Sequence, residues 1–170
     1  MDVLFDGEIH VHYGFMFLQP AEVFGPDLRD SRRGQANGLA GARIPGVLSF
    51  VTGLHTGDVP VRVEWHDTEP ELGDDWEDVV EVPFTPADDE YDLRAFDAAA
   101  ELGELPAGPH RARWLATGMD AANEVDVRMD GEPALDRYLL QLWPAPPAPD
   151  AVLRRGSEQA EYWHSVTTKR

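Results

Sequence analysis

The chain contains no cysteine. It therefore forms no disulfide bonds and offers neither a thiolate nucleophile nor a cysteine-ligated metal, which is typical of proteins in a reducing cytoplasm. No apolar run reaches the length of a membrane span. The first ten residues, MDVLFDGEIH, carry acids where a secretory signal peptide needs basic residues. We therefore expect a soluble, cytoplasmic protein.

Basic residues are scarce as well. Lysine occurs only at Lys169, and 14 Lys and Arg stand against 32 Asp and Glu, which gives a formal net charge of -18. Such a charge repels nucleic acid and anionic lipid, because both are bound through cationic groups, and it attracts basic proteins. The alternative interpretation is that the acidity only keeps the chain solvated, as in a salt-adapted host, or reflects coding bias.

Short β-type runs separated by Gly and Pro turns recur along the chain and predict its fold. Three strands are expected between Gly46 and Phe84, over residues 47–54, 59–66 and 79–84. The loop His-Thr-Gly-Asp would join the first two strands as a hairpin, and an acidic loop would join the second strand to the third. Three antiparallel strands form the smallest sheet expected to be stable alone, so we predict that this stretch organises the fold.

Further strands are expected over residues 8–18, 91–96, 110–119 and 137–143. The first would be one long strand with a bulge or bend at Gly14, whereas residues 20–46 show no regular pattern. About seven strands without alternating helices predict an all-β protein, either an antiparallel β-sandwich or a jelly roll, with Trp65 and Trp114 in its core.

The expected domain organisation is simple. A length of 170 residues favours one domain with a core of its own. We assign residues 1–143 to the β-sandwich. Residues 144–170 are predicted to be a Pro-rich linker and a C-terminal tail, with a short helix that is either docked or mobile.

The loop that follows the second of these strands concentrates acidic residues around a tryptophan. Its acids are Asp67, Glu69, Glu71, Asp74, Asp75, Glu77 and Asp78. They lack the spacing of an EF-hand, and no cluster of cations lies nearby in the sequence. Exposed aromatic residues ringed by charge are typical anchors of protein contacts. We therefore predict that Trp76 is exposed and binds a basic partner together with these seven acids.

The catalytic motifs that we sought are absent: the sequence has no Gly-x-Ser-x-Gly, no phosphate-binding loop and no Gly-x-Gly-x-x-Gly. His10 and His12 would share one face of a strand, a spacing that can hold a metal. A third ligand would have to come from Glu8, His55, Glu64 or His66. Two surface histidines are the simpler interpretation, so we expect no metal and no cofactor.

Three short segments carry a resemblance to a known family: the strand end Val82–Phe84, the turn Leu105–Gly108 and the aromatic strand Arg111–Ala116. In this order, over about residues 8–143, they resemble the competence protein J family of small bacterial inhibitors of the DNA-entry nuclease. The resemblance implies a cytoplasmic β-sandwich that binds and silences a nuclease, and it supplies no catalytic residues.

Charge and resemblance together predict a non-enzymatic, acidic protein-binding module, an inhibitor or immunity protein that blocks a basic partner such as a nuclease. A nuclease cleft is basic because it holds phosphates, and an acidic loop would enter it with fast, salt-sensitive association. We expect no direct binding of nucleic acid or membrane. Two alternatives stay open: a metal-binding sandwich or metalloenzyme using His10 and His12, and a carbohydrate- or small-ligand-binding sandwich using Trp76.

Overall fold

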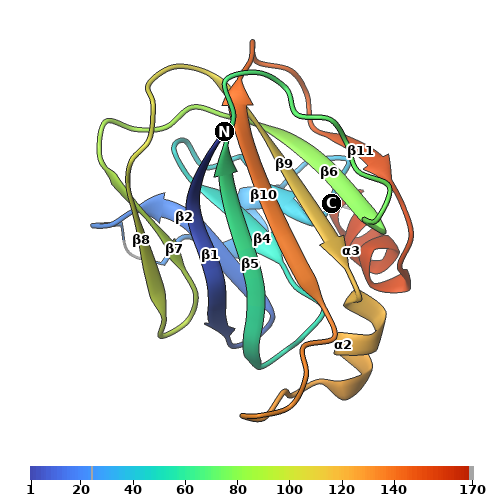
Figure 1. The fold of residues 1–170 in the computed structure, drawn as a ribbon. Coiled ribbons are helices and arrows are strands. Elements are labelled where there is room, and N and C mark those ends of the chain that lie inside the picture. Colours follow the sequence, from blue (N-terminus) through green and yellow to red (C-terminus); the bar gives the residue numbers. More distant parts are fainter. Residues whose placement is uncertain (24, 169–170) are drawn as a thin grey trace.

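The chain folds into two β-sheets that pack face to face (Figure 1). The structure is a computed structural model and describes residues 1–23 and 25–168; Phe24 of the irregular segment and residues 169 and 170 of the tail lie outside it. One sheet contains, in order, β1 (Asp2–Val11), β5 (Gly57–Trp65), β10 (Arg137–Pro144), β9 (His110–Thr117), β6 (Asp78–Phe84) and β11 (Ala151–Arg154). The other contains β3 (Ala40–Gly41), β4 (Leu48–Val51), β2 (Phe15–Pro20), β7 (Glu90–Arg94) and β8 (Ala99–Glu104).

The expected all-β, mostly antiparallel sandwich is confirmed. The pair β5–β10 is parallel, and the other strand pairs described are antiparallel. The described residues form eleven strands rather than about seven. The additional ones are short or carry little apolar alternation.

A row of aromatic rings joins the two sheets. Trp114 of β9 is 1% exposed, and its ring centroid lies 4.3 Å from that of Phe50 and 5.1 Å from that of Tyr138. Phe50 comes from β4 in the opposite sheet, so this stack crosses the core. The predicted core position of Trp114 is confirmed, and Trp65 is partly buried and packs against the same core.

The expected three-stranded sheet of residues 46–84 is wrong. β4 pairs with β2 and β3, β5 pairs with β1 and β10, and β6 pairs with β9 and β11. The predicted hairpin loop is part of a connection that takes the chain from one sheet to the other. Gly53 lies in this connection so close to Met119 that a Cβ would come within 2.3 Å of its carbonyl oxygen.

The expected long strand over residues 8–18 is also two strands in different sheets. The chain turns between β1 and β2 at Tyr13 and Gly14, whose φ angles are 66° and 67°. Two backbone hydrogen bonds hold this left-handed turn, one from Gly14 N to His55 O and one from Thr52 N to Gly14 O. Gly14 therefore marks a change of sheet rather than a bulge within a strand.

The C-terminal segment is part of the sandwich. β11 pairs with β6, and helix α3 (Glu158–Thr168) follows it, so the short C-terminal helix is confirmed. Ala160 of this helix is fully buried in the core. The first amides of α3 donate to the side chains of Ser157 and Asp120, which satisfies groups that a helix start leaves unpaired.

Two short helices complete the fold: α1 (Leu28–Arg32), within the irregular segment, and α2 (Met119–Val125), directly after β9. No helix in the described part of the chain has the length and apolar character needed to cross a membrane.

Candidate functional site

The acidic loop crosses the outer face of the six-stranded sheet. It joins β5 to β6, and strands β10 and β9 lie between these two, so the loop must pass over both. Arg113 of β9 donates to Pro70 O at 2.9 Å, and Arg137 of β10 pairs with Asp75 at 2.8 Å. The acids are therefore spread over a rigid sheet rather than on a free loop.

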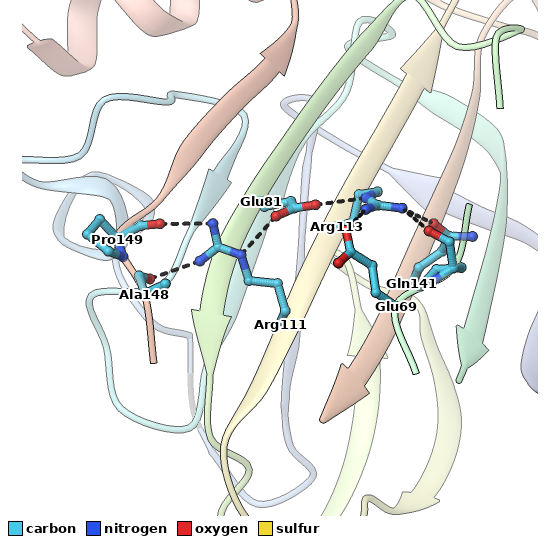
Figure 2. Close-up of polar contacts among 8 residues, drawn as sticks. Glu69, Glu81, Arg111, Arg113, Gln141, Ala148 and Pro149 are labelled. Carbon is cyan, nitrogen blue, oxygen red and sulfur yellow. Dashed lines mark hydrogen bonds and ion pairs between the residues drawn. The ribbon is translucent and has the colours of Figure 1, made fainter. Parts of the chain in front are cut away.

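A chain of buried charges lies beneath the loop (Figure 2). Figure 2 shows Arg111 and Arg113 reaching the carboxylate of Glu81 from opposite sides, each through Nε at 2.9 Å. The second arm of Arg113 reaches Glu69 of the loop, also at 2.9 Å. Arg113 is only 2% exposed. Since its guanidinium pairs with Glu81 of the sheet and with Glu69 of the loop, it ties the loop to the sheet through charge-assisted hydrogen bonds.

Two further arginines hold the acidic loop and the segment that precedes β11. Arg111 donates to Ala148 O and Pro149 O, so the segment before β11 is bound to the same group of buried charges. Arg154 of β11 donates to Gly73 O at 2.9 Å and to Trp76 O at 2.8 Å. The acidic loop is thus held from below by β9 and from the side by β11.

The predicted exposure of Trp76 is wrong. The residue is 9% exposed and packs against Val79, Leu115 and Leu139, which form a small apolar cluster on the outer face of the sheet. The guanidinium of Arg137 lies 4.1 Å from the centroid of its ring. Trp76 therefore anchors the loop internally, and it presents no open platform for a sugar.

Asp78 is also buried, with no exposed surface. Its Oδ1 accepts hydrogen bonds from Gly156 N at 2.9 Å and Ser157 N at 3.3 Å. This carboxylate holds the turn between β11 and α3, so it does not belong to the surface that we expected it to share with the other acids.

The other six acids are exposed as predicted: Asp67, Glu69, Glu71, Asp74, Asp75 and Glu77. Two of them have ion-pair partners, which corrects the expectation that no cations lie near them: Glu69 pairs with Arg113 and Asp75 with Arg137. The hydrogen bond from Arg137 lowers the pKa of Asp75. Within residues 1–23 and 25–168, no ion pair involves the remaining four acids.

His10 and His12 contact different partners. His10 Nδ1 lies 2.8 Å from Asp58 Oδ1, whereas His12, just beyond the end of β1, places Nδ1 2.9 Å from Thr56 Oγ1. The described residues contain no group of three or more His, Cys, Asp or Glu side chains placed to hold a metal ion. The structure therefore places no third ligand with these histidines, as the metal alternative required, among the residues that it describes.

Two solved structures share this fold. The first is ComJ from Bacillus subtilis, an inhibitor of the DNA degrading activity of NucA; it is 13% identical, with a TM-score of 0.56 over 85% of this chain and 98% of that chain. The second is described as crocagin biosynthetic gene J; it is also 13% identical, with a TM-score of 0.51 over 86% of this chain and all of the other. No protein-family model and no curated protein matches the sequence. The resemblance to the competence protein J family is therefore confirmed for the fold.

Proposed function

We propose that the chain is a non-enzymatic inhibitor that binds a basic protein, a nuclease above all, through the exposed acids of the loop between β5 and β6. One observation carries the proposal: Asp67, Glu71, Asp74 and Glu77 are exposed and lack an ion pair among the described residues, although their loop is fixed to the sheet by Arg113 and Arg154. A preorganised array of like charges is a surface that only a cationic partner complements.

The fixed backbone matters for affinity as well as for charge. A flexible acidic loop would lose conformational entropy on binding, whereas a loop already held by Arg113 and Arg154 loses little. The similarity to ComJ supports the choice of a nuclease as the partner, because that protein inhibits a DNA-degrading activity. A nuclease cleft that binds phosphates offers the required cations.

The test is an inhibition titration with a basic DNA nuclease from the same host. Cleavage of plasmid DNA is measured at increasing concentrations of the chain and at several salt concentrations. The unmodified chain is compared with the variant Asp67→Asn/Glu71→Gln/Asp74→Asn/Glu77→Gln, in which the four acids are replaced by amides of nearly the same shape. We expect weaker inhibition, slower association and a flatter salt dependence in this variant, since steering by exposed charge is screened by salt.

A matched control removes the same charge elsewhere. Asp88, Glu101, Glu104 and Glu124 are exposed and lie outside the acidic loop. Their replacement by Asn or Gln should leave inhibition close to that of the unmodified chain. Equal inhibition by the loop variant and the unmodified chain, with the same salt slope, would remove the acidic loop from the interface.

A further inference from the structure

A small cavity lies beside helix α2 and the segment that leads into β10, and no residue of the acidic loop lines it. Figure 1 shows where these two elements lie. Its volume is about 230 Å³. Much of its wall is apolar, with Leu54, Ala122, Val125 and Leu135 among the lining residues. Because Val125 and Leu135 are 46% and 44% exposed, the cavity opens to the surface through an apolar rim.

Asp136 supplies a buried carboxyl group to this wall. The residue is 3% exposed, and its Oδ2 accepts hydrogen bonds from the hydroxyl of Tyr138 and from Leu54 N. Both donors are neutral, and Asp136 makes no ion pair with any residue that the structure describes. Burial raises the pKa of Asp136, although the hydrogen bond from Tyr138 and the charge of Arg128 act in the opposite direction.

The other charged groups that line the cavity form no ion pair with Asp136. Arg128 lines the wall, but its guanidinium donates to Glu8 at 2.9 Å, to Asp58 O at 2.7 Å and to Glu132 O at 2.9 Å. Its guanidinium is thus held by β1, β5 and the segment before β10. Glu132 adds a second carboxylate to the lining, so the cavity carries more acid than base.

Size limits what can enter. Sites for drug-sized ligands measure about 300–1,000 Å³, and this cavity is smaller. An apolar wall beside a buried acid matches a long side chain with an aliphatic stem and a cationic end, as in Arg and Lys.

We propose that this cavity receives one Arg or Lys side chain of the partner protein, with the stem against Leu54 and Leu135 and the cation at Asp136. The identification of the occupant as a protein side chain rests on the proposed function, in which the partner is basic. The cavity would then act as an anchor pocket, since buried basic or aromatic anchors dominate many interfaces, while the acidic loop steers association.

The pocket can be tested without the partner. The probes have a similar aliphatic stem of three or four carbons and end groups of different charge. They are n-butylguanidinium chloride, n-butanol and sodium butyrate, each titrated into the full chain while backbone amide shifts are followed by NMR. We expect saturable shifts at Leu54, Ala122 and Asp136 with butylguanidinium, about tenfold weaker binding of butanol, and no binding of butyrate, because only the first pairs with a carboxylate. Absence of saturable shifts at these amides, or equal affinity for butanol, would overturn the proposal.

Two variants locate the effect. Asp136→Asn keeps an oxygen that can accept from Tyr138 and should weaken butylguanidinium binding about tenfold or more. Leu135→Arg, at an exposed position, should place a competing guanidinium at the mouth and abolish binding even if the first variant folds poorly. Leu153→Arg is the control, since Leu153 on β11 is 46% exposed and does not line the cavity. Unchanged affinity in Leu135→Arg would refute the pocket.

The outcomes separate this inference from the proposed function. Butylguanidinium binding should be unaffected by Asp67→Asn/Glu71→Gln/Asp74→Asn, because these residues do not line the cavity and, unlike Glu77, accept no hydrogen bond from Gly118 beside Asp136. If the probe fails to bind while the acidic loop still governs inhibition, the pocket is wrong and the inhibitor proposal stands. If the probe binds and no basic nuclease is inhibited, the pocket is retained and the choice of partner is wrong.

Discussion

Arg137 lies over the face of Trp76, with 4.1 Å between its guanidinium carbon and the ring centroid. The same guanidinium pairs with Asp75, the residue next to the tryptophan. One arginine of β10 thus holds both the apolar anchor of the acidic loop and one of its charges. Trp76 therefore contributes to the stability of the fold, and any effect of its replacement on binding must be separated from the effect on stability.

Trp76→Ala should lower the free energy of unfolding by about 3 kcal/mol, in the range of large-to-small changes at buried aromatic positions. The reason is the loss of its packing against Val79, Leu115 and Leu139. Chemical denaturation measures the change. Phe96→Ala is the control, because Phe96 is 65% exposed and its loss should cost less than about 0.5 kcal/mol. Equal small effects in both variants would show that the loop does not depend on Trp76.

Glu81→Gln should destabilise the chain by about 3–5 kcal/mol, because it leaves the buried guanidiniums of Arg111 and Arg113 without their shared carboxylate. Glu69→Gln is the matched comparison. It removes a carboxylate from Arg113 as well, but the side chain of Glu69 is 65% exposed, so solvent screens the loss and the cost should stay below about 1 kcal/mol. Urea unfolding of both variants gives the two values. A smaller loss of unfolding free energy for Glu81→Gln than for Glu69→Gln would contradict the structural role given to Glu81 between Arg111 and Arg113.

Gly38→Ala should displace α3. A Cβ on Gly38 would lie 2.0 Å from Trp163 O and 2.8 Å from His164 N, so the helix backbone itself would have to move. We expect a loss of at least about 2 kcal/mol in unfolding free energy and faster amide exchange in α3. Gly25→Ala, where no atom lies within 4 Å of the added carbon, serves as the control. Unchanged exchange in α3 of the Gly38 variant would mean that the helix does not dock as described.

Stability should fall with pH below about 6.5 because of His110. Burial lowers the pKa of His110, although its Nδ1 contacts Gly108 O. Between this lowered value and about 6.5, the unfolded chain binds more protons than the folded one, so the free energy of unfolding decreases as pH decreases. His110→Phe removes the titration and keeps a ring against Trp65 and Phe84. Between pH 7 and 5, the unmodified protein should therefore lose more unfolding free energy than the His110→Phe variant; equal losses in the two proteins would contradict the assignment.

The strands were predictable where one face is buried and the other is wet. Val59, Val61 and Val63 are buried and alternate with less buried residues along β5, as the sequence indicates. The pairing of strands was not predictable in the same way. β4 and β5 both present apolar residues to one core from opposite sheets, and a hairpin would produce the same local pattern. The position of Tyr13 in the left-handed region likewise gives no signal in the sequence.

The candidate site was predictable in part for a similar reason. Exposure of the acids follows from their charge and their loop context. Burial of Trp76 depends on Val79, Leu115 and Leu139, which come from three different strands and become one apolar patch only after the sheet has formed. The pairing of Arg113 with Glu69 and of Arg137 with Asp75 was not predicted either, because both arginines are distant in sequence from the loop.

The order of strands in the larger sheet has a consequence for synthesis on the ribosome. Its two central strands, β10 and β9, are encoded late, whereas β1 and β5 emerge early. Until β10 emerges, the edge of β5 that it will occupy has no partner within this sheet, and until β9 emerges β6 has none on that side. Such non-local pairing folds slowly, and open strand edges invite association with other chains. A nascent chain of this protein is thus most exposed to aggregation, and most dependent on chaperones, from the emergence of β5 until β10 has emerged.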